Sequence, residues 1–129
     1  MRALGICLAA ALLAGPLVLA PAAQADDDAG TRPCGKKEVC LYSQEDGHGV
    51  IVYRNTLEAI EKGDITNVDP KVEARSARTP LPPDGDCAIG LYPDHGLGGD
   101  ATWIAGPMTN LAKPGEPSLT VGSMYEDCG

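Results

Sequence analysis

The sequence contains none of the short motifs that mark common hydrolases and nucleotide-binding enzymes. The patterns H-E-x-x-H, G-x-S-x-G and G-x-x-x-x-G-K-[ST] are all absent. The nearest approach to an acid–base pair is Asp94 beside His95, or Glu45 and Asp46 close to His48. These residues fall where polar turns are expected. We therefore predict that there is no catalytic site and that the protein is not an enzyme.

Basic residues are scarce. The chain has 10 Lys and Arg against 18 Asp and Glu, for a net charge of −8. Because such a surface repels phosphate groups, we predict no nucleic-acid partner and no anionic membrane partner. A cationic partner or a divalent ion is compatible with this charge, but acidity is also common on soluble surfaces.

The cysteines lack the spacing of a metal site. There is no C-x-x-C, and neither histidine clusters with a cysteine, so we predict no metal ligands and no cofactor. Cys7 lies within residues 1–25, which are predicted below to be a signal peptide that is removed. The remaining four cysteines are an even number and predict two disulfides: Cys34, Cys40, Cys87 and Cys128. Three pairings are open. We favour Cys34 with Cys40 and Cys87 with Cys128, because each bond then lies within one half of the chain.

The N-terminal segment has the order of parts of a secretory signal peptide. Arg2 is followed by an uncharged stretch at 3–20 and then by Ala23-Gln24-Ala25, an A-x-A cleavage pattern. The alternative is a membrane anchor, but the stretch is rich in alanine and glycine and contains Pro16. We expect that residues 1–25 are removed and that the protein is secreted and extracellular.

The two halves of the chain resemble each other when one is shifted by 50 residues. Residues 41–49 then align with 91–99, and Leu-Tyr and a glycine seven residues after the tyrosine coincide. Each half continues with a β-favouring run, a short helical turn that begins near Thr56 or Thr109, and a final strand. The three predicted ranges are 50–53, 56–63 and 72–77 in the first half, and 101–104, 109–115 and 119–125 in the second.

This repeat, with 16 Gly and 11 Pro, predicts an all-β domain of two similar four-strand units packed together. Neither unit is large enough to bury a face by itself, so pairing creates the core. The predicted boundaries are 26–33 for a disordered acidic segment, 34–129 for the domain, 34–78 and 87–128 for its units, and 79–86 for a connector.

The tyrosine-to-glycine spacing resembles the Greek-key pattern of βγ-crystallins. In that pattern an aromatic residue packs on a folded hairpin, and a glycine takes a backbone conformation that a side chain would oppose. Tyr92, Leu97 and Gly99 fit it, with leucine in place of the second aromatic residue. Tyr42 and Gly49 also fit, although a glycine stands at the bulky position between them.

Further features narrow the resemblance. With the signal peptide, the four later cysteines and the opening P-C-G-K-K-E-V-C-L-Y at 33–42, residues 34–128 resemble the secreted actinobacterial metalloproteinase inhibitors of the Streptomyces metalloproteinase inhibitor group. The resemblance implies a βγ-crystallin-like fold of two disulfide-stapled Greek keys, and an extracellular metalloproteinase as partner. The alternative is an extracellular βγ-crystallin module, structural or ligand-binding, that inhibits nothing.

The same resemblance bears on calcium. Calcium-binding βγ-crystallins place a pair of Asn/Asp residues two positions before Ser-Ser, so that hard oxygens meet the ion. The corresponding stretches are 72–77 and 118–123. Each lacks the Asn/Asp pair, and in each only one serine of Ser-Ser remains. Arg75 adds a positive charge where an ion would sit. We therefore expect weak or absent calcium binding.

An inhibitor needs a loop that is held rigid, so that binding loses little conformational entropy. The connector meets this requirement, because Pro80, Pro82 and Pro83 restrict it and Cys87 ends it. We assign the inhibitory loop to these residues together with Leu81, which suits a cleavage site less well because a proline follows it.

The residues just after Cys87 complete the predicted inhibitory site. Metalloproteinases of the thermolysin type favour an apolar residue after the scissile bond, which Ala88 or Ile89 would supply. The alternative for Ile89 is that it alternates with Leu91 as a core residue of the first strand of the second unit.

Overall fold

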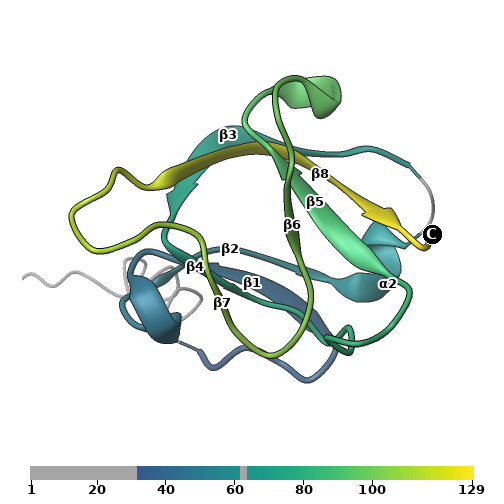
Figure 1. Ribbon diagram of the computed structural model, residues 1–129, viewed down its shortest axis with the longest axis horizontal. Coiled ribbons are helices and arrows are strands. Elements are labelled where there is room, and N and C mark those ends of the chain that lie inside the picture. The colour runs from purple at the N-terminus through teal and green to yellow at the C-terminus, as the bar shows by residue number, and fades with distance from the viewer. Residues whose placement is uncertain (1–31, 62–63) are drawn as a thin grey trace, which may run out of the picture.

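The structure, a computed structural model, describes residues 32–61 and 64–129, so the predicted signal peptide and most of the acidic segment lie outside it. The described residues form mostly β-structure, which confirms the predicted class: two four-stranded antiparallel sheets and one turn of α-helix. Figure 1 shows the sheets as two layers. The strands are β1 (Glu38–Tyr42), β2 (Ile51–Thr56), β3 (Thr66–Ala74), β4 (Ser76–Arg78), β5 (Ala88–Tyr92), β6 (Thr102–Ile104), β7 (Thr109–Asn110) and β8 (Leu119–Asp127), and the helical elements are α2 (Leu57–Ile60) and the 3-10 turns η1 (Glu45–Gly47) and η2 (His95–Leu97).

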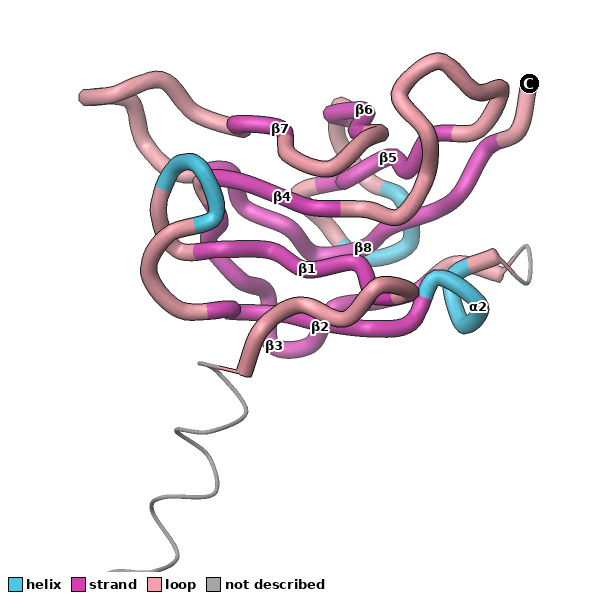
Figure 2. Tube along the Cα trace, turned by 90° about the horizontal axis from the view of Figure 1, so that it is seen from below, coloured by secondary structure: helices cyan, strands magenta, loops and turns pink. Residues whose placement is uncertain are grey.

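Each sheet takes three strands from one half of the chain and one from the other. The strand orders are β2-β1-β4-β7 and β3-β8-β5-β6, and Figure 2, seen from below, shows the first of them face-on. β3 of the first half lies in the sheet of the second half, and β7 of the second half lies in the sheet of the first. The halves therefore interlock, whereas the sequence predicted two packed units, each with all four strands from its own half.

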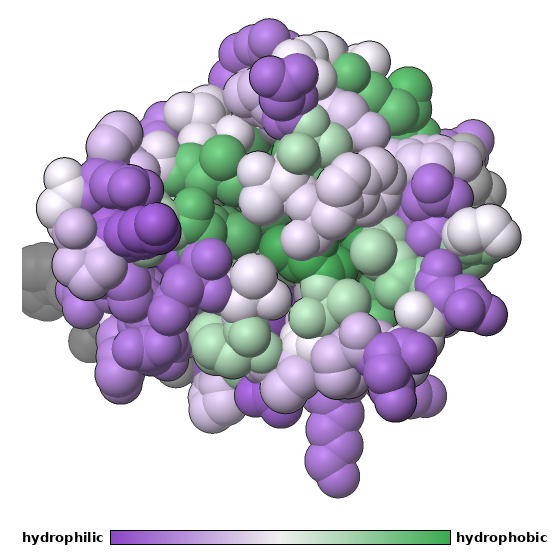
Figure 3. Space-filling view, viewed as in Figure 1, coloured by the Kyte–Doolittle hydropathy of each residue, from purple (hydrophilic) through white to green (hydrophobic). Residues whose placement is uncertain are grey.

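The core lies between the two sheets and is built from alternate residues of the strands. Val39 and Leu41 of β1 and Ile89 and Leu91 of β5 are fully buried in it, and Ile60 adds the apolar side of α2. Figure 3 shows apolar side chains gathered in the middle of one face, with polar side chains around them. Within the described ranges, no helix has the length and apolar character needed to cross a bilayer.

The helical turns were predicted correctly in one half only. In the first half, α2 begins after Thr56, whose Oγ1 accepts a hydrogen bond from the N–H of Ala59 at 3.3 Å. The prediction for 109–115 is wrong, because Thr109 and Asn110 form β7 and pair with β4. A free edge of β4 is available there, and Pro114 would in any case end a helix.

The final strand predicted at 72–77 is two strands in different sheets. β3 ends at Ala74 and β4 begins at Ser76, so Arg75 carries the chain from one sheet to the other. β3 also begins earlier than predicted, at Thr66. The other predicted strands are confirmed with shifted ends, as β2, β6 and β8.

Two folded hairpins carry the tyrosine-to-glycine pattern. Gly49 and Gly99 have φ angles of +80° and +90°. Residues with a side chain rarely adopt such positive φ angles. A Cβ atom at Gly99 would lie 2.4 Å from Cγ of Pro93. Leu97 also has a positive φ, +63°, and Tyr42 is buried, with its Cζ atom 3.8 Å from the Cβ position of Gly47 in the first hairpin. The glycine conformation implied by the resemblance is therefore present in both halves.

Replacing Gly99 by valine is expected to lower the free energy of unfolding by about 1–2 kcal/mol more than the same change at Gly98, because Gly99 combines positive φ with the contact to Pro93. Gly98 is the matched control, since its φ is −82° and its Cβ would lie 3.0 Å from Cβ of Asp94. Urea unfolding of both variants gives the difference. Equal losses would contradict the role assigned to Gly99.

Candidate functional site

The connector between β4 and β5 presents an exposed loop at residues 82–86. It lies outside the strands, as its prolines predict. Just before the loop, the side chain of Leu81 is buried and its carbonyl accepts a hydrogen bond from the N–H of Gly106 at 2.8 Å. Within the loop, the N–H of Gly85 donates to the carbonyl of Pro82 at 3.2 Å. The loop is therefore a compact turn that is fixed to the core at its start.

A disulfide fixes the other end of the loop. Cys87 is bonded to Cys128, and Cys34 to Cys40, which is the favoured pairing. Directly after Cys87, the half-buried Ala88 begins β5 and pairs with the end of β8. Figure 1 shows this loop at the same end of the molecule as α2 and the C-terminal residue.

Two residues of the predicted inhibitory loop point away from solvent. Ile89 is fully buried among core residues of both sheets, and Leu81 is 8% exposed. In the folded domain both side chains pack in the core and offer a partner almost no surface. The predicted binding surface therefore does not include them, and Ile89 is a core residue, as in the alternative interpretation. Pro80, Pro82 and Pro83 are exposed, and Cys87 and Ala88 are half-buried.

The surroundings of this loop are acidic. Asp84 and Asp86 are exposed within it, and the carboxylate of Glu126 lies within 4.8 Å of the Cys87 and Cys128 sulfurs. Burial, and then the charge of Glu61, raises the pKa of Glu126. The cysteine–glutamate groups in the described chain are not ready metal sites, because all four of their sulfurs are in disulfides.

Two buried serines hold the folded hairpins. The hydroxyl of Ser76 accepts a hydrogen bond from the N–H of Gly47 at 2.9 Å and donates to the carbonyl of Gln44 at 2.6 Å. Ser123 makes the equivalent pair of bonds in the η2 hairpin, also at 2.9 and 2.6 Å. The serines that were considered as calcium ligands therefore already use their hydroxyl groups within the fold.

Two asparagines on the exchanged strands bond to the same hairpins, and the sequence alone did not identify them. Asn110 of β7 accepts a hydrogen bond from the N–H of Asp46 at 2.8 Å and donates to its carboxylate at 3.0 Å. Asn67 of β3 accepts one from the N–H of Gly96 at 2.9 Å. The available signal was the dipeptide Thr-Asn, which occurs in both halves, at 66–67 and 109–110.

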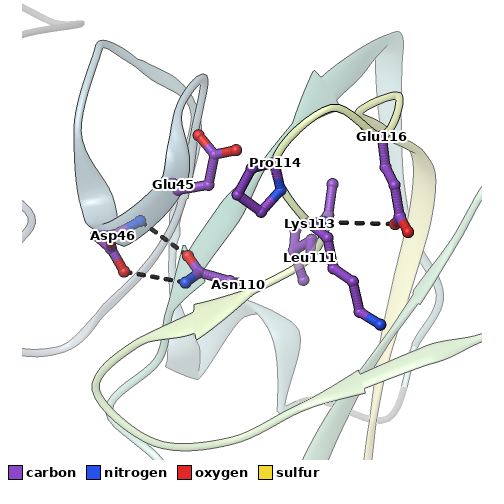
Figure 4. A pocket seen from close by; sticks show the side chains of 8 residues that line it. Glu45, Asp46, Asn110, Leu111, Lys113, Pro114 and Glu116 are labelled. Atoms are coloured by element: carbon purple, nitrogen blue, oxygen red, sulfur yellow. Dashed lines mark hydrogen bonds between the residues drawn. The ribbon is translucent and has the colours of Figure 1, made fainter.

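A cleft of about 360 Å³ lies between η1 and the segment that joins β7 to β8. Figure 4 shows Glu45 and Asp46 on one side of it and Pro114 and Glu116 on the other, with Asp46 bonded to Asn110. Three of its lining residues also bond to Arg75, which lies between β3 and β4.

The guanidinium of Arg75 donates hydrogen bonds to several oxygen atoms of residues that line this cleft. It donates to the carboxylate of Glu45 at 3.0 Å and to the carbonyls of Glu116 and Lys113 at 2.7 and 2.9 Å, and the hydroxyl of Ser118 lies at 3.4 Å. Its hydrogen bond is the main reason that the pKa of Glu45 is lowered. The oxygens that a cation would use here are therefore already bonded to a positive side chain.

Comparison of the chain with models of protein families, with curated proteins and with solved structures finds no match. No relative therefore supplies a function.

Proposed function

We propose that this protein is a secreted inhibitor of an extracellular metalloproteinase, and that it binds the enzyme through the loop between β4 and β5. The observation that carries the proposal is that this loop is exposed at residues 82–86 yet fixed on both sides. Leu81 anchors its start in the core, and the Cys87–Cys128 disulfide anchors its end. Such a loop loses little freedom when it binds in a protease cleft.

The proposal includes a βγ-crystallin-like fold of two Greek keys. In a Greek key the fourth strand returns to lie beside the first, and here β4 pairs with β1 and β8 pairs with β5. Positive φ angles at Gly49 and Gly99 support the same assignment. The two disulfides are compatible with the proposed extracellular location.

Calcium is not part of the proposed activity. The candidate oxygens near η1 are bonded to Arg75, and the buried hydroxyls of Ser76 and Ser123 hold the hairpins. A calcium ion would have to displace these contacts. This favours the inhibitor over a calcium-binding module.

The test is inhibition of a thermolysin-class metalloproteinase by the folded, oxidised protein. Ala88→Asp is expected to weaken inhibition by roughly tenfold or more, because it places a charge against an apolar pocket. Ala101→Asp is the matched control, since Ala101 is also half-buried but precedes β6. Reversing the charges of Asp84 and Asp86 should instead change the association rate and its salt dependence.

Every variant is first checked for native far-ultraviolet circular dichroism. Wild type that inhibits, with Ala88→Asp equal to Ala101→Asp, would place the reactive site elsewhere. Folded wild type that inhibits no metalloproteinase tested would leave the alternative, an extracellular module without inhibitory activity.

A further inference from the structure

One residue of the second half holds the start of the exposed loop. Gly106 lies between β6 and β7 and is buried. Its N–H donates to the carbonyl of Leu81 at 2.8 Å, and its carbonyl accepts from the N–H of Thr79 at 3.1 Å. The hydroxyl of Thr79 also donates to this carbonyl, at 3.4 Å. The backbone of Gly106 therefore bonds to the connector on both sides of Pro80.

The same residue lies against the loop itself. A Cβ atom at Gly106 would be 3.2 Å from Cβ of Pro83, closer than an ordinary van der Waals contact. Its φ angle is +94°, a conformation that a side chain would oppose. Glycine at this position therefore lets the ring of Pro83 rest on the backbone of the segment between β6 and β7.

The prolines alone do not fix the loop. Proline restricts φ but leaves ψ free, and residues 82–86 form no strand pairing. Between the anchors at Leu81 and Cys87, the loop has its internal hydrogen bond from Gly85 to Pro82 and the contact of Pro83 with Gly106. The contact with Gly106 connects the exposed part of the loop to the body of the domain.

We propose that Gly106 is a positioning residue for the binding loop: it seats Pro83 and bonds Thr79 and Leu81, and so fixes the conformation in which residues 82–86 meet a protease. This inference rests on the proposed function for its effect on inhibition. Its effect on the loop does not depend on that function.

Gly106→Ala tests the inference, and Gly115→Ala is the matched control. Gly115 has nearly the same φ, +87°, but no atom lies within 4 Å of its Cβ position. Because the two φ angles are nearly equal, the φ penalty is similar in both variants, and the difference between them reports mainly the contact with Pro83. Two readouts are made on each folded variant: the rate at which subtilisin, which is not a metalloproteinase, cuts within residues 82–86, and the inhibition constant for a thermolysin-class enzyme.

Gly106→Ala is expected to be cut several-fold faster and to inhibit about tenfold more weakly, while Gly115→Ala behaves like wild type in both assays. In a Pro83→Gly background the extra effect of Gly106→Ala should disappear, because the clash is gone. Equal cutting rates in Gly106→Ala, Gly115→Ala and wild type would overturn the inference. So would a Gly106→Ala effect that persists unchanged without Pro83.

The outcomes separate this inference from the proposed function. If wild type inhibits nothing, the proposed function fails, and the cutting rates still decide whether Gly106 positions the loop. If Gly106→Ala does not fold, amide hydrogen exchange of wild type decides: protection of the Gly106 N–H comparable to that of core strands supports the inference, and rapid exchange overturns it.

Discussion

Replacing Cys87 and Cys128 together by alanine is expected to lower the free energy of unfolding by about 4 kcal/mol. The two cysteines are 41 residues apart in the sequence, and the entropy that a cross-link of this length removes from the unfolded chain corresponds to roughly that value. A domain of this size has a total stability of about 5–15 kcal/mol. The double replacement should therefore remove a large share of the total stability.

The second disulfide provides the comparison. Cys34 and Cys40 are 6 residues apart, so their replacement should cost only about 2 kcal/mol by the same argument. Urea unfolding of the oxidised wild type and the two double variants measures both values. A loss at Cys34 and Cys40 as large as that at Cys87 and Cys128 would show that loop length does not govern the stabilisation.

Replacing Arg75 by methionine is expected to lower the free energy of unfolding by about 2–3 kcal/mol, because hydrogen bonds from a charged donor contribute more than neutral ones. Its side chain is only 17% exposed and bonds to the backbone before β8 and to the η1 hairpin. Methionine keeps much of the length of the side chain but leaves these oxygens without a donor.

Lys71→Met is the control for Arg75. Lys71 bonds to Asp94 at 2.9 Å, but both side chains are largely exposed, and exposed ion pairs contribute little. Lys71→Met should therefore change the free energy of unfolding by no more than about 0.5 kcal/mol. Equal losses for the two variants, measured by thermal and urea unfolding, would contradict the role given to Arg75.

The Arg75 variant should also change the pH dependence of stability. The pKa of Glu45 is lowered in the folded protein, mainly by its hydrogen bond from Arg75. A lowered pKa contributes stability above the ordinary pKa of the group, 4.5, and this contribution is lost as the pH falls through the folded value. The difference between wild type and Arg75→Met should therefore shrink as the pH falls below 4.5 and through the lowered pKa of Glu45.

The sequence predicted the strands that carry Leu-Tyr, because an apolar residue, a tyrosine and a following glycine at fixed spacing mark a strand and its turn. It did not locate the third strand of each half. The sequence comparison aligned Thr56 with Thr109 as the starts of two similar helical turns. The structure instead gives Asn67 and Asn110 the same role, each opposite the buried serine that clamps a hairpin.

The proposed binding loop was harder to predict than the strands. Three prolines were enough to place an exposed connector, since proline cannot donate to a strand ladder. They could not show that Leu81 faces the core or that Ile89 is fully buried. Gly106 lies 20 or more residues from the loop it contacts, and its importance depends on a φ angle and a neighbour that only the folded chain reveals.

Because β3 and β7 are exchanged, the two halves of the chain bind each other as two separate chains of a complex would. Each disulfide lies within one half, so a single cut at residues 82–86 would leave two polypeptides with no covalent bond between them. Each fragment would still contribute an edge strand to the sheet of the other. The connector therefore links two fragments that complete each other, and the exchanged strands together with the core between the sheets supply the non-covalent contacts that join them.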